Sequence, residues 1–136
     1  MHVLLTGAAG FIGSHVCERL VGAGHRGVGL DAFDGYLYPA ENKRSNAAAL
    51  AKLPASQFSL IEGDICDRAV VARGLDEHID VVCHLAALAG VRPSLAAPER
   101  YVRVNVEGTV TILERMRELD KRRLVIENRS LRNVLR

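Results

Sequence analysis

The 136-residue sequence has no tryptophan, few other aromatic residues and only three cysteines. An odd number of cysteines, none of them spaced as Cys-x-x-Cys, argues against a disulfide framework and against a zinc site. No apolar run approaches the length of a membrane span, and a strand-like run begins at residue 2 where a charged leader would stand. We therefore expect a reduced, cytoplasmic protein that binds no metal and does not enter a membrane.

The net charge of +2 is too small to imply a polyanionic partner, although the basic residues crowd the stretch 115–136. Such a cluster can bind nucleic acid, but it is more typical of a solvated helix end and tail, so we expect no nucleic-acid partner. A hydrophobic content of 49% with 25% charged residues fits one compact domain with its own core. We assign this domain to residues 1–126 and a divergent basic tail to residues 127–136.

Short apolar runs rich in Val, Ile and Leu alternate with longer helical patterns, which predicts an α/β protein. Because the predicted strands are apolar on both faces, they belong in a parallel sheet covered by helices on each side. Asp67 is expected to cap one helix and Pro98 to begin another. The predicted strands are residues 2–6, 27–31, 57–62, 79–85 and 123–126, and the predicted helices are residues 11–23, 46–53, 68–75 and 98–119.

The last predicted helix, 98–119, carries apolar residues on more than one stripe. A second apolar face needs a second partner, and another copy of the chain in a homodimer would supply one. The loops predicted at 32–39 and 86–97 both follow carboxyl ends of strands. In a doubly wound sheet, ligands bind at that edge.

Three glycines, Gly7, Gly10 and Gly13, stand between a predicted strand and a predicted helix, and Phe11 and Ile12 lie between the last two. In this setting the first glycine permits a tight turn, the second lets the backbone approach a pyrophosphate, and the third lets the helix pack against the strand. The helix then points its free amides at the anion. The alternative is a glycine-rich turn without a ligand, while a nucleoside-triphosphate loop is excluded because no lysine follows Gly13.

Asp31 ends the second predicted strand, about twenty residues beyond the glycines. A carboxylate at this place accepts hydrogen bonds from the adenosine ribose and repels a 2′-phosphate. The position therefore favours NAD over NADP. The alternative is an ordinary turn aspartate.

The spacing Gly7-x-x-Gly10-x-x-Gly13 resembles the short-chain dehydrogenase/reductase superfamily, and the segment 10–13 resembles its extended branch, the NAD-dependent epimerase/dehydratase family. Further segments agree in the same order, and they are most similar to UDP-glucuronate 4-epimerases. They are Gly63-Asp64-Ile65-Cys66-Asp67, His84-Leu85-Ala86-Ala87, the stretch 89–94 with Arg92 and Ser94, and the stretch 98–109 with Asn105. The resemblance covers residues 2–126, the N-terminal part of the family's pattern.

The resemblance implies a Rossmann-type doubly wound sheet with strand order 3-2-1-4-5, NAD as cofactor and, in the full-length family, a UDP-sugar partner. It places Asp64 at the adenine amine and Arg92 near a cofactor or substrate diphosphate, although Arg92 also fits a surface loop. Asn105 is expected either at the active-site floor or in a structural hydrogen bond. The cofactor residues indicated are Gly7, Gly10, Phe11, Ile12, Gly13, Asp31, Asp64, Ile65, Ala86, Ala87, Arg92 and Asn105, and the substrate residues are Arg92 and Ser94.

Family epimerases depend on a Tyr-x-x-x-Lys pair, in which the lysine lowers the pKa of the tyrosine. Four residues after the tyrosines of this sequence, at 36, 38 and 101, stand Ala40, Asn42 and Asn105, so no catalytic residue is assigned. After residue 126 the sequence departs from the family's serine/threonine-rich pattern, as an interrupted reading frame would cause. We expect an NAD-binding portion that does not epimerise alone; the alternative is a non-catalytic NAD sensor or interaction module.

Overall fold

The computed structural model describes residues 1–126, and the predicted basic tail of residues 127–136 lies outside them. Five parallel strands form one sheet in the order β3-β2-β1-β4-β5, which confirms the predicted doubly wound topology. The strands are β1 (His2–Thr6), β2 (Arg26–Asp31), β3 (Phe58–Glu62), β4 (Val81–His84) and β5 (Leu124–Ile126).

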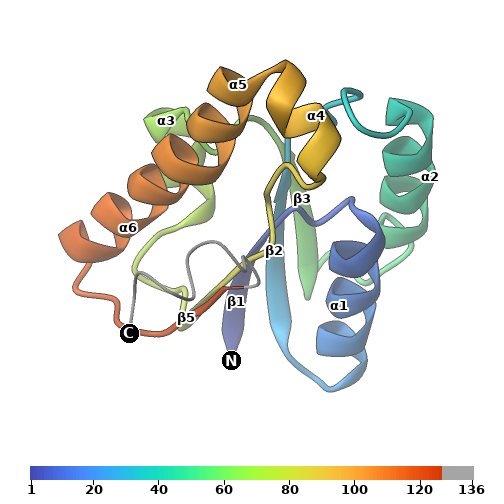
Figure 1. Ribbon diagram of the computed structural model, residues 1–136. Helices are drawn as coiled ribbons and strands as arrows, with labels where there is room; N and C mark the ends of the chain where they lie inside the picture. Colours follow the sequence, from blue (N-terminus) through green and yellow to red (C-terminus); the bar gives the residue numbers. More distant parts are fainter. Residues whose placement is uncertain (127–136) are drawn as a thin grey trace.

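Helices cover both faces of the sheet and make a three-layer molecule (Figure 1). On one face, α1 (Phe11–Gly22) and α2 (Ala40–Leu50) enclose a core around Leu5. On the other face, α3 (Arg68–Gly74) and α6 (Gly108–Glu118) enclose a core around Leu4. Successive strand residues point to opposite faces of the sheet. Because helices cover both faces, the residues on each side of a strand are apolar.

The helix predicted at 98–119 is divided into three parts. The structure has α5 (Pro98–Val102), a π-helical turn η1 (Arg103–Glu107) and α6. Gly108, where α6 begins, packs so closely on Ile65 that a Cβ there would overlap the isoleucine side chain. The second apolar face is confirmed, because a stripe of four exposed residues runs along the outside of η1 and its neighbouring helices: Val102, Val106, Val110 and Leu113.

Two predictions of local structure were wrong. The helix predicted at 46–53 is α2 at Ala40–Leu50, because tertiary contacts hold its polar first half, which carries no apolar pattern. The predicted loop 86–97 contains a short helix, α4 (Val91–Ala96), in spite of Pro93. A proline in the first turn costs no helical hydrogen bond, since those amides have no partner within the helix.

The predicted cap of α3 is confirmed. Asp67 Oδ1 accepts hydrogen bonds from the amides of Ala69 at 2.8 Å and Val70 at 3.4 Å.

Within residues 1–126, no helix combines the length and the apolar composition that crossing a bilayer requires.

Candidate functional site

A cleft of about 550 Å³ lies across the carboxyl ends of β1 to β4, the edge at which doubly wound sheets bind ligands. The glycine-rich turn, the ends of β2 and β3, α2 and the segment after β4 line it. The structure thus brings together most of the residues predicted for a cofactor site. Those that line the cleft are Gly7, Gly10, Phe11, Asp31, Asp64, Ile65, Ala86 and Ala87.

The backbone of the glycine-rich turn explains why glycine stands at each of its three positions. Gly7 has φ of 73°, in the left-handed region, and a Cβ there would lie 2.9 Å from the amide nitrogen of Ala86. A Cβ on Gly13 would overlap the carbonyl group of Gly7, and one on Gly10 would lie 3.1 Å from the same oxygen. The turn therefore brings backbone, with no side chain between, to the floor of the cleft.

The first turn of α1 begins at the edge of this cleft, which Phe11 lines, and it carries free hydrogen-bond donors. The N-cap Gly10 supplies no capping side chain, and no acidic residue stands in the first turn. The amides of Phe11 and Ile12 make no hydrogen bond to any of residues 1–126. Free amides at the positive end of a helix dipole bind anions such as phosphate.

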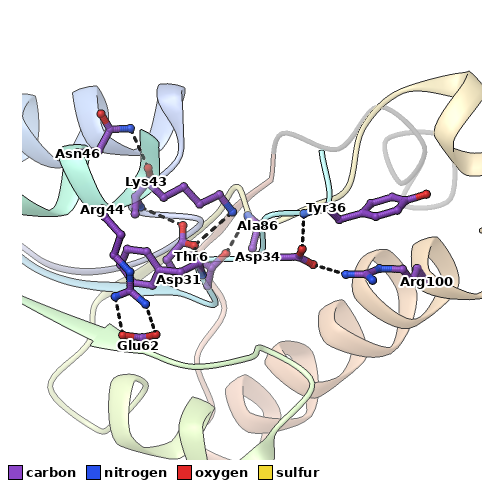
Figure 2. Close-up of polar contacts among 12 residues, drawn as sticks. Thr6, Asp31, Asp34, Tyr36, Lys43, Arg44, Asn46, Glu62, Ala86 and Arg100 are labelled. Carbon is purple, nitrogen blue, oxygen red and sulfur yellow. Dashed lines mark hydrogen bonds and ion pairs between the residues drawn. The ribbon is translucent and has the colours of Figure 1, made fainter. Parts of the chain in front are cut away.

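Asp31 is buried at the end of β2, with an exposure of 4%, and its carboxylate is largely occupied. Its Oδ2 accepts from the amide of Ala9 at 3.0 Å, and its Oδ1 accepts from the amide of Phe33 at 2.8 Å. The ammonium of Lys43 lies 3.5 Å from the same Oδ1 (Figure 2). Asp31 and Lys43 both line the cleft, where a carboxylate oxygen can accept from a ribose hydroxyl and an ammonium group can donate to a ribose oxygen. Sequence reasoning missed Lys43 because it lies in a polar stretch without a motif.

The polar half of α2 is fixed by contacts to other elements. Arg44 donates to the two carboxylate oxygens of Glu62 at 2.8 and 2.6 Å, and its guanidinium lies 3.9 Å from the centre of the Phe33 ring (Figure 2). The hydrogen bond from Arg44 lowers the pKa of Glu62. Asn46 donates to the carbonyl of Ala9 at 2.8 Å and so joins α2 to the glycine-rich turn. These contacts position Lys43 beside Asp31.

Asp64 and Ile65 form the wall of the cleft that follows β3. Asp64 Oδ1 accepts from the amide of Cys66 at 2.9 Å, and its Oδ2 pairs with Arg103 at 3.0 Å. Ile65 is buried, with 5% exposure, where it can support a flat ring. Arg103, on η1, is a second residue that sequence reasoning missed, since only the folded chain brings it to Asp64.

The loop after β2 is tied to α5 across the cleft's edge. Asp34 Oδ1 accepts from the amide of Tyr36 at 2.7 Å, and its Oδ2 pairs with Arg100 at 2.8 Å (Figure 2). The Arg100 guanidinium lies 4.4 Å from the centre of the Tyr36 ring, whose hydroxyl donates to the Pro93 carbonyl at 3.3 Å. Burial raises the pKa of Asp34, but the hydrogen bonds from Tyr36 and Arg100 outweigh burial and lower it.

Five predicted site residues do not line the cleft: Ile12, Gly13, Arg92, Ser94 and Asn105. Arg92 and Ser94 are on α4, where Arg92 is exposed and the Ser94 hydroxyl donates to the carbonyl of Val91 at 2.6 Å. Asn105 uses its side-chain amide to hold Leu88, accepting from the Leu88 amide at 2.8 Å and donating to its carbonyl at 2.9 Å. Of the two alternatives for Asn105, the structure shows the structural hydrogen bond, made to a loop. Residues 1–126 hold no cluster of His, Cys, Asp or Glu that could bind a metal ion.

A protein-family profile described as GDP-mannose 4,6 dehydratase matches residues 4–129. The chain belongs to this family. The motifs had indicated the same NAD-dependent epimerase/dehydratase group, and that prediction is confirmed.

Two named proteins are similar to the chain over most of its length. A probable UDP-glucuronate 4-epimerase from Rhizobium meliloti is 37% identical over 131 residues, which are 96% of this chain and 38% of that protein. A UDP-glucose 4-epimerase from Klebsiella pneumoniae is 37% identical over 118 residues, which are 86% of this chain and 81% of that protein.

Solved structures of sugar-nucleotide epimerases are also similar to this chain. A UDP-glucuronic acid 4-epimerase from Bacillus cereus, in complex with UDP-glucuronic acid and NAD, matches with a TM-score of 0.74 and 38% identity. The match covers 91% of this chain and 38% of that one. The chain thus spans little more than a third of the length of the Rhizobium and Bacillus proteins, at 38% of each.

Proposed function

We propose that this chain binds NAD in the cleft as the dinucleotide-binding portion of a UDP-sugar 4-epimerase. The observation that carries the proposal is the pair of free amides, at Phe11 and Ile12, above a glycine turn that leaves no room for side chains. Asp31 at the end of β2 is the second support. The solved Bacillus cereus relative, 38% identical, is in complex with NAD.

The cleft residues suit each part of NAD. The pyrophosphate fits at the amides that begin α1, and the adenosine ribose fits beside the ion pair of Asp31 and Lys43. The adenine fits beside Asp64 and Ile65, which leaves the segment that begins at Ala86 for the nicotinamide half. When bound, NAD would accept a hydride from a sugar carbon and return it.

A UDP-sugar is the proposed substrate class. Arg92 is exposed beside the cleft's far end on α4, and a guanidinium makes forked hydrogen bonds to a diphosphate. Ser94 on the same helix is the second proposed substrate contact. Titration with UDP tests both assignments, and we expect weaker UDP binding in the Arg92→Gln and Ser94→Ala variants than in the wild type.

The Tyr-x-x-x-Lys pattern on which family epimerases depend does not occur in these 136 residues. For example, the hydroxyl of Tyr101 donates to the Ala89 carbonyl at 2.7 Å, and the residue four positions later is Asn105. We expect NAD binding without interconversion of UDP-glucuronate by these residues alone.

Calorimetric titration with NAD tests the proposal on three proteins: the wild type, Gly13→Ala and Gly22→Ala. Both glycines belong to α1, but a Cβ on Gly13 would overlap the Gly7 carbonyl group, whereas a Cβ on Gly22 would meet nothing within 4 Å. We expect heat from the wild type and Gly22→Ala, and none from Gly13→Ala. A wild-type protein that melts cooperatively yet gives no heat and no thermal shift with millimolar NAD would contradict the proposal.

We also propose that the chain forms a homodimer through α5, η1 and α6. The four exposed apolar residues named above lie on one side of these elements, at spacings of four, four and three residues. A stripe of this kind on a helix surface favours packing against a second helix.

A further inference from the structure

A buried chain of hydrogen-bonded side chains joins the sheet to α6 beneath the cleft, and the function proposed above assigns no role to its histidine. This hydrogen-bond chain consists of Thr6 at the end of β1, His84 at the end of β4 and Thr109 in α6, with exposures of 0%, 2% and 4%. Thr6 Oγ1 lies 2.6 Å from His84 Nδ1, and His84 Nε2 lies 2.9 Å from Thr109 Oγ1. Polar groups buried this deeply are costly unless each has a partner, and here each has one.

The direction of each hydrogen bond follows from its neighbours. Thr109 donates its hydroxyl proton to the carbonyl of Asn105 at 2.7 Å, since a carbonyl can only accept. Thr109 Oγ1 must then accept from His84 Nε2. A neutral imidazole has a single N–H, so Nδ1 is the acceptor and the Thr6 hydroxyl donates to it. Only the Nε2–H tautomer satisfies the whole chain.

Both ends of this chain reach the cleft wall that follows β4. At one end, the amide of Ala86 donates to Thr6 Oγ1 at 3.2 Å (Figure 2). At the other end, Asn105 accepts from Thr109 and holds the amide and carbonyl of Leu88 with its own side chain. Ala86 and Leu88 line the cleft, so the histidine connects the two points at which this wall is fastened.

We propose that His84 is a positioning residue for the nicotinamide half of the cleft. As a neutral imidazole protonated on Nε2, it joins β1 to α6 and so fixes the backbone between Ala86 and Leu88 against the glycine-rich turn. The proposal rests on the proposed binding of NAD in this cleft.

The surroundings of the ring keep it in the required form. Burial lowers the pKa of His84 to about 4, so the imidazole is neutral near neutral pH. An imidazolium would direct a second N–H at Thr6, whose hydroxyl proton would then have no acceptor among residues 1–126. The wall also has little freedom to move, because Gly7 lies so close that a Cβ on it would be 2.9 Å from the Ala86 nitrogen.

The test compares two threonines of α6 that differ in one respect. Thr109 and Thr111 are both buried and both donate to the carbonyl four residues earlier, but only Thr109 also accepts from His84. We expect Thr109→Val to weaken NAD binding about tenfold. Thr111→Val, at a similar cost in stability, and Thr109→Ser, which restores the hydroxyl, should stay within about twofold. Equal losses for the two valine variants would overturn the proposal.

A double variant tests whether the effect passes through the histidine. Thr6→Val and Thr109→Val each remove one end of the same series of hydrogen bonds through His84. We therefore expect the double variant to bind NAD little worse than the weaker-binding single variant. Losses that simply multiply, about a hundredfold in total, would mean that the two sites act independently and would overturn the proposal.

Two measurements without cofactor separate this proposal from the binding of NAD. Nitrogen-15 spectra of labelled histidine should show His84 with a bare Nδ1 and a protonated Nε2; the opposite tautomer would overturn the proposal. Amide exchange at Ala86 and Leu88 should be about tenfold faster in Thr109→Val than in Thr111→Val, and equal rates would count against it. If these hold while the wild type binds no NAD, only the proposed function fails.

Discussion

Mild acid should destabilise this protein through His84 before its carboxylates take up protons. The ring is 2% exposed, and burial lowers its pKa from 6.5 to about 4. Between these two values the unfolded chain binds a proton that the folded protein does not, so the free energy of unfolding falls as the pH falls. The full difference corresponds to about 3 kcal/mol at about 1.4 kcal/mol per pKa unit.

Urea titration at about pH 7.5 and about pH 5 covers most of this change while leaving most carboxylates ionised. The wild type should lose about 2 kcal/mol of unfolding free energy between the two conditions. His84→Asn, which has no group that titrates in this range at position 84, should lose much less. The quantity to compare is therefore the loss of unfolding free energy between the two pH values in each protein, and not the stability of either protein at one pH.

The matched control is His15→Asn, because His15 is exposed on α1 and lies outside the buried chain. This variant should keep the wild-type fall in stability. If His84→Asn and the wild type lose the same free energy between the two pH values, the reasoning from burial is refuted. A change of slope in the urea dependence would instead show that the variant altered the unfolded or native state itself.

Three further outcomes are expected. Asp31→Asn should reduce the preference for NAD over NADP about 10- to 100-fold in paired calorimetric titrations, because it removes the charge that repels a 2′-phosphate; an unchanged preference would contradict the assignment of the ribose to Asp31. Val106→Glu should convert a dimer to a monomer in sedimentation, because it places a charge within the exposed stripe, and a wild type that is already monomeric would refute the proposed interface. Asp67→Ala should lower the free energy of unfolding by about 1 kcal/mol in urea titration, since it removes the hydrogen bonds to Ala69 and Val70; Asp67→Ser should restore most of it.

The parts of the site that could be predicted from sequence are those in which a local backbone requirement selects the residue. Gly7 needs a left-handed conformation, and Gly13 needs the absence of a Cβ, so their spacing is visible without any knowledge of the fold. The strand order followed from the family resemblance. The position of Asp31 followed from the end of an apolar strand.

The parts that could not be predicted depend on contacts between distant segments. The first half of α2 has no apolar pattern, and it is held by Arg44 on Glu62 and by Asn46 on the glycine-rich turn. Lys43 comes to Asp31 only because these contacts fix the helix. Arg103 meets Asp64 across 39 residues of sequence, and no local pattern records such a pair.

The π-helical turn at Arg103–Glu107 shows how such contacts change a helix that sequence predicts as continuous. Asn105 must point its amide at Leu88 while its carbonyl accepts from Thr109, and Gly108 must approach Ile65. A π turn adds one residue to the helical circuit and is often found at functional sites. The π turn therefore lies where the hydrogen bonds from His84 through Thr109 reach Asn105, the residue that holds Leu88 in the cleft wall.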